Sequence, residues 1–246
     1  MTFMRIALLE DDPSQLVHLA TTLEMQLSER GLSVRCVMFQ SGRALLEATR
    51  TDTFDLMVLD WSVPDLDGMA LLRLVRRTGG LTMPILTLML SSRGREQEVS
   101  AALAEGADDY VVKPFRPHEL SARVYRLLAP FRTSENEGLQ WGRWTFNVGA
   151  ASVQYAGAAE LIELRPSESK LALALFRHSG RAVSRDYLLE VCGLADDLSG
   201  LRALETRIYR LRQKLALNQK SDTRIQAVYG IGYRLDVDDF VGTPAQ

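Results

Sequence analysis

Four short apolar runs in the first half of the sequence each end in a polar or charged residue. The residues at these ends are Glu10 with Asp11, Asp60, Ser91 and Lys113. Three carboxylates that meet in one place repel one another unless they share a hard cation such as Mg²⁺. The lysine would add a second, compact positive charge. If the runs are neighbouring strands, the set predicts an acidic, metal-binding pocket with a lysine at its edge.

The residues between these ends predict the sheet that would bring them together. Helical spacing is clearest after the first run, where Asp12 and Pro13 form a typical helix start. Apolar strands that alternate with helices are typical of a parallel sheet covered on both faces. Ligands of such sheets bind beyond the carboxyl ends of the strands. The five apolar runs span residues 6–9, 34–39, 55–59, 84–90 and 110–112.

Each of these polar residues, taken singly, has a simpler interpretation. Asp12 is more often a helix cap than a ligand, and Asp108 and Asp109 are typical of a turn before a strand. Any one of the acids at a strand end would more often be a solvated loop residue. Convergence of the whole set on one edge of the sheet is what favours a site.

The length and the charge distribution predict two domains. A chain of 246 residues with 46% apolar and 24% charged residues is typical of a globular protein large enough for two ordinary domains. Residues 1–138 hold 15 basic against 19 acidic residues, and residues 139–246 hold 14 against 12. An acidic half followed by a half with a basic helix indicates two domains with different partners.

The sequence predicts neither a membrane partner nor export. The apolar stretch MPILTLML is too short to cross a bilayer, and acids follow the first apolar run where a secretory cleavage site would be. Cys36 and Cys192 are far apart and have no metal-binding or redox spacing. We therefore expect a cytoplasmic protein with reduced cysteines.

The second half contains a basic helix followed by a hairpin. Residues 202–215 have four apolar residues at helical spacing, and residues 223–235 predict a strand, a Gly-x-Gly turn and a second strand. A basic stripe alone is usually a solvated helix face. With the hairpin behind it, the pattern is typical of a winged helix, whose recognition helix enters the major groove of DNA. The basic residues of this helix are Arg202, Arg207, Arg210, Arg212 and Lys214.

Four ordered motifs resemble the receiver domain of bacterial two-component response regulators. They are LLEDDP, LDWSVPDLDG, LMLSSRG and GADDYVVKPF, and the match covers residues 1–128. The resemblance implies an α/β domain with a flavodoxin-like, doubly wound sheet of five parallel strands. It also implies that Asp60 takes a phosphoryl group from a sensor histidine kinase and carries it as an aspartyl phosphate.

The same resemblance implies roles for the residues around Asp60. Ser91 would be the switch hydroxyl, Tyr110 the switch aromatic, and Lys113 the cation that contacts the phosphoryl oxygens. The bond between Lys113 and Pro114 is expected to be cis. A carboxylate accepts a phosphoryl group readily once a metal and an ammonium offset the developing charge. Mg²⁺ would be held by Glu10, Asp11, Asp60 and the backbone carbonyl of Ser62.

Residues 139–240 resemble the winged-helix effector domain of the OmpR/PhoB class, after a linker at 129–138 and before a tail at 241–246. The motifs GRAVSRDYLLEV, RALETRIYRLRQKL and VYGIGYRL carry the resemblance. Arg207 stands where the family often has His, Tyr229 where it often has Arg, and Cys192 where it usually has Trp. These departures bear on the target sequence more than on the role. The residues expected to contact promoter DNA are Arg202, Arg207, Arg210, Arg212, Lys214 and, in the wing, Tyr229.

The resemblance further implies that phosphorylated receivers form a homodimer through their fourth helix, fifth strand and fifth helix. The charged residues matching this face are Asp108, Asp109, Glu119 and Arg123. Val99 departs from the pattern, because a basic residue is usual there. Two weak DNA-binding modules joined in this way would gain effective concentration on adjacent half-sites. RNA polymerase is a further possible partner.

We therefore predict a phosphorylation-controlled, DNA-binding transcription regulator and not an enzyme. Phosphatases of the haloacid dehalogenase type need an Asp-x-Asp motif, whereas Ser62 stands at the second position here. The run GIGYRL lacks the third glycine and the helix of a dinucleotide-binding motif. The alternative left open is a regulator that binds DNA without phosphorylation and uses its receiver for dimerisation or protein docking.

Overall fold

A computed structural model of the chain describes residues 2–78, 85–92, 94–129, 138–155, 161–217 and 222–237. They form two compact units, one containing the described residues up to Ala129 and the other those from Gly138 onward. Most of the predicted linker and the whole predicted tail lie outside the described residues. In the described part of the chain, no helix has the length and apolar character needed to cross a membrane.

The first unit is a five-stranded parallel sheet, which confirms the predicted fold. Its order is β2-β1-β3-β4-β5, and every neighbouring pair in it is parallel. The strands are β1 (Thr2–Leu9), β2 (Leu32–Phe39), β3 (Leu56–Asp60), β4 (Leu86–Ser91) and β5 (Asp109–Val112). The inner strand β3 is buried along its whole length, as expected for a sheet that has helices on both faces.

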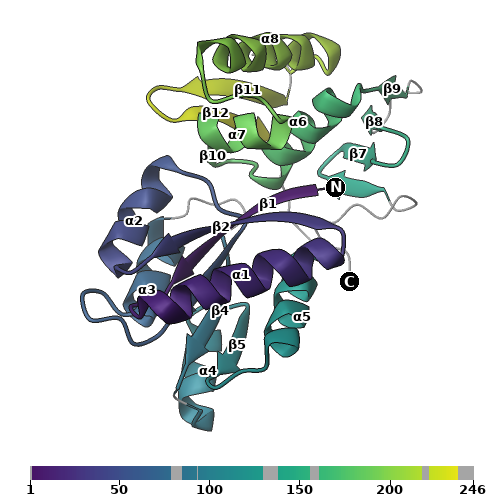
Figure 1. Cartoon of the computed structure of the whole chain (residues 1–246). Coiled ribbons are helices and arrows are strands. Elements are labelled where there is room, and N and C mark those ends of the chain that lie inside the picture. The colour runs from purple at the N-terminus through teal and green to yellow at the C-terminus, as the bar shows by residue number, and fades with distance from the viewer. Residues whose placement is uncertain are drawn as a thin grey trace. The chain divides into compact units, whose positions relative to one another are not determined.

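Five helices cover the two faces of this sheet (Figure 1). They are α1 (Pro13–Glu29), α2 (Gly42–Thr51), α3 (Gly68–Thr78), α4 (Glu96–Ala104) and α5 (Pro117–Leu127). Helices α1 and α5 pack together on one face. Leu45, Leu71 and Ala102, from α2, α3 and α4, belong to one hydrophobic cluster on the other face. The N-cap role predicted for Asp12 is confirmed, since its carboxylate accepts from the backbone N–H groups of Ser14 and Gln15.

The second unit begins with an antiparallel sheet in the order β6-β7-β8-β9 and ends with a three-stranded sheet in the order β10-β12-β11. The first sheet comprises β6 (Leu139–Trp141), β7 (Trp144–Asn147), β8 (Ser152–Tyr155) and β9 (Ile162–Glu163). The second comprises β10 (Ala182–Ser184), β11 (Thr223–Val228) and β12 (Gly232–Val237). The antiparallel pairing of β11 with β12 confirms the predicted hairpin.

Three helices complete the second unit: α6 (Pro166–Arg177), α7 (Arg185–Cys192) and α8 (Leu198–Lys214). Helix α8 begins four residues before the basic segment predicted as helical, because Asp197 caps it by accepting from the backbone N–H of Gly200. A side chain at Gly200 would lie 1.8 Å from the carbonyl oxygen of Ala195, so the close approach of loop and helix requires glycine. Leu204, Ile208 and Leu211 bury the inner face of α8.

Candidate functional site

The carboxyl ends of β1 and β3 bring three acidic side chains together. The parallel register aligns Leu9 with Leu59, so the residues that follow, Glu10 and Asp60, come to the same edge of the sheet. One carboxylate oxygen from each of Glu10, Asp11 and Asp60 lies within 4.8 Å of the others. Glu10 and Asp60 are buried and Asp11 is exposed. The cluster predicted from the strand ends is therefore assembled.

Lys113 lies between the two buried acids. Its Nζ donates a hydrogen bond to Oδ2 of Asp60 at 2.7 Å and another to Oε2 of Glu10. Its backbone N–H donates to the carbonyl of Ser91, which fixes the residue beside β4. The Lys113–Pro114 bond is cis, as expected.

Burial and charge act in opposite directions on the ionisation of this group. Burial raises the pKa of Glu10, and the hydrogen bond from Lys113 only partly offsets that effect. Burial by itself lowers the pKa of Lys113, but the hydrogen bonds to Asp60 and Glu10 outweigh it and leave the pKa raised. The lysine is therefore held in its charged form, where it balances negative charge that water reaches poorly.

The donor set fits Mg²⁺. Hard divalent cations prefer carboxylate and carbonyl oxygens, and this edge gathers carboxylates from two neighbouring strand ends. Asp60 is held in place, because its Oδ1 accepts from the backbone N–H of Ser62 and its Oδ2 from Lys113. One acid, Asp11, is exposed and reachable from solvent.

The loop that follows Asp60 is anchored on the start of α2. Asp65 accepts from the hydroxyl of Ser41 at 2.7 Å and from the backbone N–H groups of Gly42 and Arg43, each at 3.0 Å. The hydrogen bond from Ser41 and those from the backbone hold the pKa of Asp65 well below its ordinary value. At the other end of the loop, a Cβ on Gly68 would lie 2.2 Å from the backbone oxygen of Asp60. These contacts fix the backbone on which Asp60 and Ser62 sit.

The two predicted switch residues are both inside the receiver. Ser91, at the end of β4, is fully buried, and Tyr110 in β5 is 7% exposed. The ring of Tyr110 meets that of Trp61 edge to face, with centroids 6.4 Å apart. Trp61 directly follows Asp60, so the aromatic pair joins the residue after the acidic pocket to β5.

The charged residues of the predicted dimer face make ion pairs within the receiver. Asp109 pairs with Arg123 and Arg126, and Arg123 also pairs with Glu119. Asp108 accepts from the guanidinium of Arg76 in α3 at 2.9 Å and from the backbone N–H of Thr87 at 2.7 Å. Val99, at the position where a basic residue was expected from the resemblance, is half-buried and packs against the core of the receiver.

Arg76 itself was not singled out by sequence reasoning. Its guanidinium donates to the carbonyl oxygens of Ile85, directly before β4, and of Gly106, in the loop after α4. It also donates to Asp108. The side chain is only 16% exposed. No local pattern distinguishes such an arginine, because its partners are distant in sequence.

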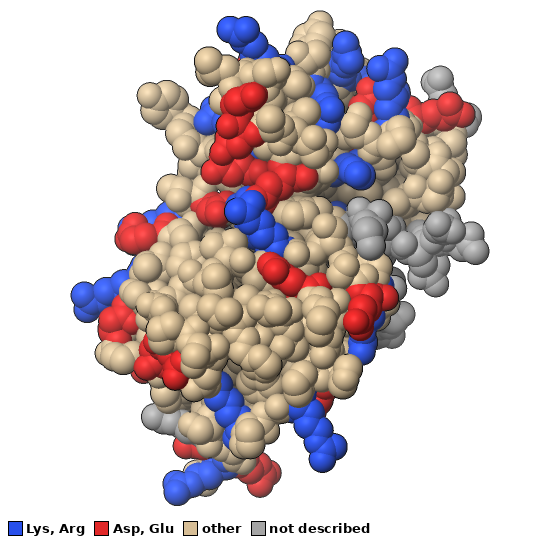
Figure 2. Space-filling view, viewed as in Figure 1, with Lys and Arg blue, Asp and Glu red and all other residues tan. Residues whose placement is uncertain are grey.

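The basic residues of α8 divide into two groups. Arg207 donates to the carbonyl of Cys192, Arg212 to the carbonyl of Ile225, and Lys214 to the carboxylate of Glu168. Arg202 and Arg210 are exposed, and within the described residues neither forms an ion pair. Figure 2 shows Lys and Arg side chains projecting around α8, at the top of the view.

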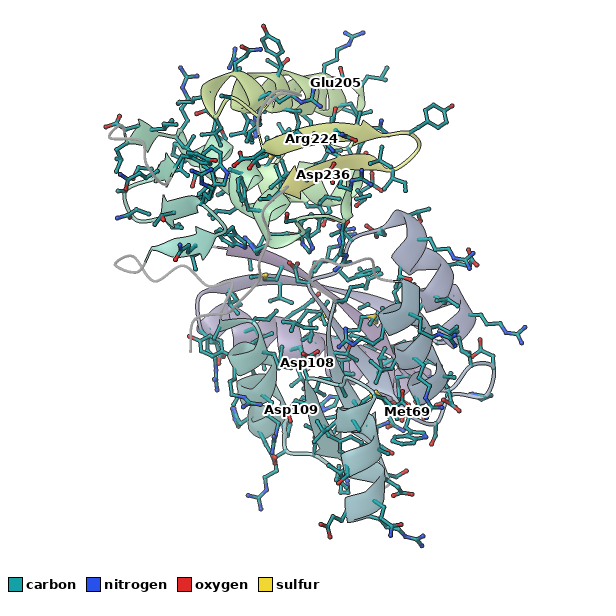
Figure 3. The ribbon with its side chains drawn as sticks, turned by 180° about the vertical axis from the view of Figure 1, so that it is seen from behind. Met69, Asp108, Asp109, Glu205, Arg224 and Asp236 are labelled. Atoms are coloured by element: carbon teal, nitrogen blue, oxygen red, sulfur yellow. The ribbon has the colours of Figure 1, made fainter. Side chains whose placement is uncertain are left out.

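The hairpin after α8 carries the other predicted contact. Tyr229 lies in the turn between β11 and β12 and is fully exposed. Within the hairpin, Arg224 and Asp236 lie opposite each other on the two strands (Figure 3), and Asp236 also pairs with Arg234. The pair between Arg224 and Asp236 joins the two strands, whereas Arg234 and Asp236 lie on the same strand, β12.

The outer face of α8 includes residues that the search for basic side chains missed. Thr206, Tyr209 and Gln213 are exposed and follow Arg202 at helical spacing. The signal was present in the sequence, because residues four, seven and eleven positions after Arg202 share its face. These residues were missed because the stripe was defined by its positively charged side chains alone.

Comparison with known proteins agrees with this arrangement. The model of the response regulator receiver domain matches residues 6–125, and that of the transcriptional regulatory protein C-terminal domain matches residues 159–235. The transcriptional regulatory protein AfsQ1 of Streptomyces coelicolor is 35% identical over 94% of this chain and 97% of its own. The alkaline phosphatase synthesis transcriptional regulatory protein PhoP of Bacillus subtilis is 31% identical over 94% and 96%. The DNA-binding response regulator MtrA of Mycolicibacterium smegmatis is 34% identical over 94% and 96%.

A parallel sheet with an acidic pocket, followed by a winged helix, defines a receiver joined to a DNA-binding effector domain. The chain belongs to the OmpR/PhoB family of two-component response regulators. Its receiver and its DNA-binding domain make it a transcription regulator of the two-component type.

Proposed function

We propose that phosphorylation of Asp60 switches this regulator into the form that binds promoter DNA. A carboxylate oxygen of Asp60 would attack the phosphorus of a phosphohistidine on a sensor kinase. The phosphorus–nitrogen bond would break, and the imidazole would leave with the electron pair and regain a proton. The observation that carries this assignment is the hydrogen bond from Lys113 to Asp60 inside a buried acidic pocket.

The residues around Asp60 would each contribute to this transfer. Glu10, Asp11, Asp60 and the carbonyl of Ser62 would hold Mg²⁺, which when bound supplies positive charge beside the phosphoryl oxygens. Lys113 would contact a phosphoryl oxygen as its bond to Asp60 is exchanged. The serine hydroxyl at the neighbouring strand end, Ser91, would donate to another. Mg²⁺ binding and the two contacts with phosphoryl oxygens are all supported by the position of these residues at or next to strand ends.

The switch would pass through the contact between Trp61 and Tyr110. Movement of Ser91 toward the phosphoryl group would change the space beside Tyr110, whose ring already rests on the residue after Asp60. Two packings of one aromatic side chain are the kind of bistable element that a local charge change can bias.

The dimer would use the face formed by α4, β5 and α5. Asp108, Asp109, Glu119 and Arg123 would lie at this face. Formation of the dimer would exchange some of their present ion pairs for pairs to a second receiver. The pair between Arg123 and Glu119 is the most exposed of these, so its exchange would cost least. The dimer would place two effector domains on adjacent half-sites.

DNA would be bound by α8 and the hairpin tip. Arg202 and Arg210 project from the outer face of α8, while Arg207, Arg212 and Lys214 lie at its borders and would reach phosphates by exchanging their present partners. Tyr229 at the tip would lie against a sugar or phosphate. RNA polymerase is a proposed partner on the promoter. We assign residues 1–128 to the receiver, 129–138 to the linker, 139–240 to the effector domain and 241–246 to the tail.

A direct test is the phosphorylation of the purified full-length chain by acetyl phosphate in the presence of Mg²⁺, followed by intact mass measurement. The parent should gain one phosphoryl group that hydroxylamine removes, and the Asp60→Asn variant should gain none. Asp65→Asn is the matched control, because it removes a nearby carboxylate on the same loop and should leave the acceptor in place. A parent that stays unmodified, or an Asp60→Asn variant that still gains the group, would refute the assignment.

A further inference from the structure

We propose that Tyr209 is a specificity-determining residue that reads the C5-methyl group of a thymine in the major groove. The inference rests on the proposed DNA-binding role of α8 and adds the chemical feature that the helix would recognise. Tyr209 is an exposed aromatic side chain among the basic residues of α8.

Tyr209 lies on the face of α8 directed away from the core. Leu204, Ile208 and Leu211 are buried on the inner face. Residues 202, 206, 209 and 213 follow one another at steps of four, three and four, which places them along one helical face, and all four are exposed. A helix lying in the groove on this face would present Tyr209 and its neighbours to the base edges.

The ring of Tyr209 is exposed without a partner in its own domain. It is 62% exposed, and within the described residues it makes neither a ring contact nor a hydrogen bond. A single exposed aromatic residue is ordinary on a protein surface. Tyr209, however, lies between Arg202 and Arg210, the two exposed arginines of the helix. These arginines indicate that the ligand of this face is DNA.

Among the exposed residues of this helix face, Tyr209 offers the largest apolar surface. Arg207, Arg212 and Lys214 donate to groups of their own domain, so the exposed centre of the helix face combines two arginines with Thr206, Gln213 and one aromatic ring. Arginines bind phosphates or guanine, and Gln binds adenine. Among major-groove groups, the methyl of thymine is the apolar one, and an aromatic ring is a suitable partner for it.

The test uses the full-length chain treated with acetyl phosphate and Mg²⁺, and a duplex enriched by it from a random pool. Each thymine of that duplex is replaced in turn by deoxyuridine, which lacks only the methyl group. We expect one such replacement per half-site to weaken binding about fourfold, the effect of uncovering one methyl-sized group. The Tyr209→Ala variant should bind the thymine and uracil duplexes equally, and Tyr209→Phe should retain the parent's preference.

Arg210→Ala is the matched control, since it removes an exposed neighbour on the same helix. It should weaken binding to both duplexes and keep their ratio. A parent that enriches a duplex but binds its thymine and uracil forms equally would overturn this inference alone. A Tyr209→Ala variant that keeps the parent's ratio of affinities for the thymine and uracil duplexes would also overturn this inference alone. Failure to enrich any duplex would overturn the DNA-binding proposal and this inference with it.

Discussion

The ammonium of Lys113 lies 2.7 Å from Oδ2 of Asp60 and also donates to Glu10, so that one lysine spans the two buried acids of the receiver. These residues come from the ends of β1, β3 and β5, three strands of one parallel sheet. The pocket thus has its own internal cation. Acceptance of a phosphoryl group would require that cation to turn from a carboxylate to the incoming oxygens.

Replacing Lys113 by Met should destabilise the receiver and make its stability depend more strongly on Mg²⁺ than that of the parent. Glu10 and Asp60 would be left buried without a positive partner, and removing one member of a largely buried ion pair costs roughly 3–5 kcal/mol. Thermal unfolding with and without Mg²⁺ measures the effect, and Lys113→Arg is the control that keeps the charge. Equal responses of the parent and Lys113→Met to Mg²⁺ would contradict this account of the pocket.

Removing Arg76 should cost the receiver far more than removing its neighbour Arg73. Arg76 holds two carbonyl oxygens and Asp108 while mostly buried, so truncation to Ala leaves polar groups unpaired at about 1–3 kcal/mol. Arg73 makes an exposed pair with Glu105, which is worth about 0–1 kcal/mol. Urea denaturation of Arg76→Ala and Arg73→Ala compares the two. Similar losses in the free energy of unfolding would show that the hydrogen bonds of Arg76 do not stabilise the receiver more than an exposed ion pair does.

The contribution of Asp65 should vanish in acid. The pKa of Asp65 in the folded chain lies below its unfolded value, so the carboxylate stabilises the fold at any pH above the unfolded pKa of about 3.9. That stabilisation is lost as the pH falls toward the folded pKa. Asp65→Asn should therefore melt below the parent at pH 7 and approach it below about pH 4. A difference in melting temperature that stays constant down to pH 3 would count against the capping role.

Trp61 should report the state of the pocket. Its ring contacts Tyr110 and it follows Asp60 directly, so a change in either residue alters its surroundings. Tryptophan emission should change when acetyl phosphate and Mg²⁺ are added to the parent. The change should disappear in Trp61→Phe, which retains Trp141 and Trp144 in the second unit. An unaltered response in Trp61→Phe would assign the signal to those other residues.

The sequence predicted the sheet and its acidic edge because both follow from local patterns. Apolar runs identify buried strands, and a residue that ends such a strand in a parallel sheet can come to only one edge. Glu10, Asp60 and Lys113 could therefore be grouped from their positions in the sequence alone. The winged helix was equally accessible, since the hairpin after α8 has its own turn signal.

Contacts between distant parts of the chain were not accessible in the same way. Nothing local indicates that Arg76 holds the loop before β5, or that Arg207 and Arg212 turn to carbonyl groups of their own domain. Such partners depend on how helices pack, which the spacing of one helix does not specify. The start of α8 was missed for a related reason, because the cap at Asp197 lies outside the basic segment.

Binding to an enriched duplex, at fixed salt, tests the central claim most directly. The parent and Asp60→Ala are each titrated with and without acetyl phosphate and Mg²⁺, with salt held constant because phosphate contacts alone change affinity by orders of magnitude. The account predicts that the phosphodonor tightens binding by the parent and leaves Asp60→Ala unchanged. Equal affinity in all four conditions would contradict the switch and leave only a DNA-binding domain beside an uncoupled receiver.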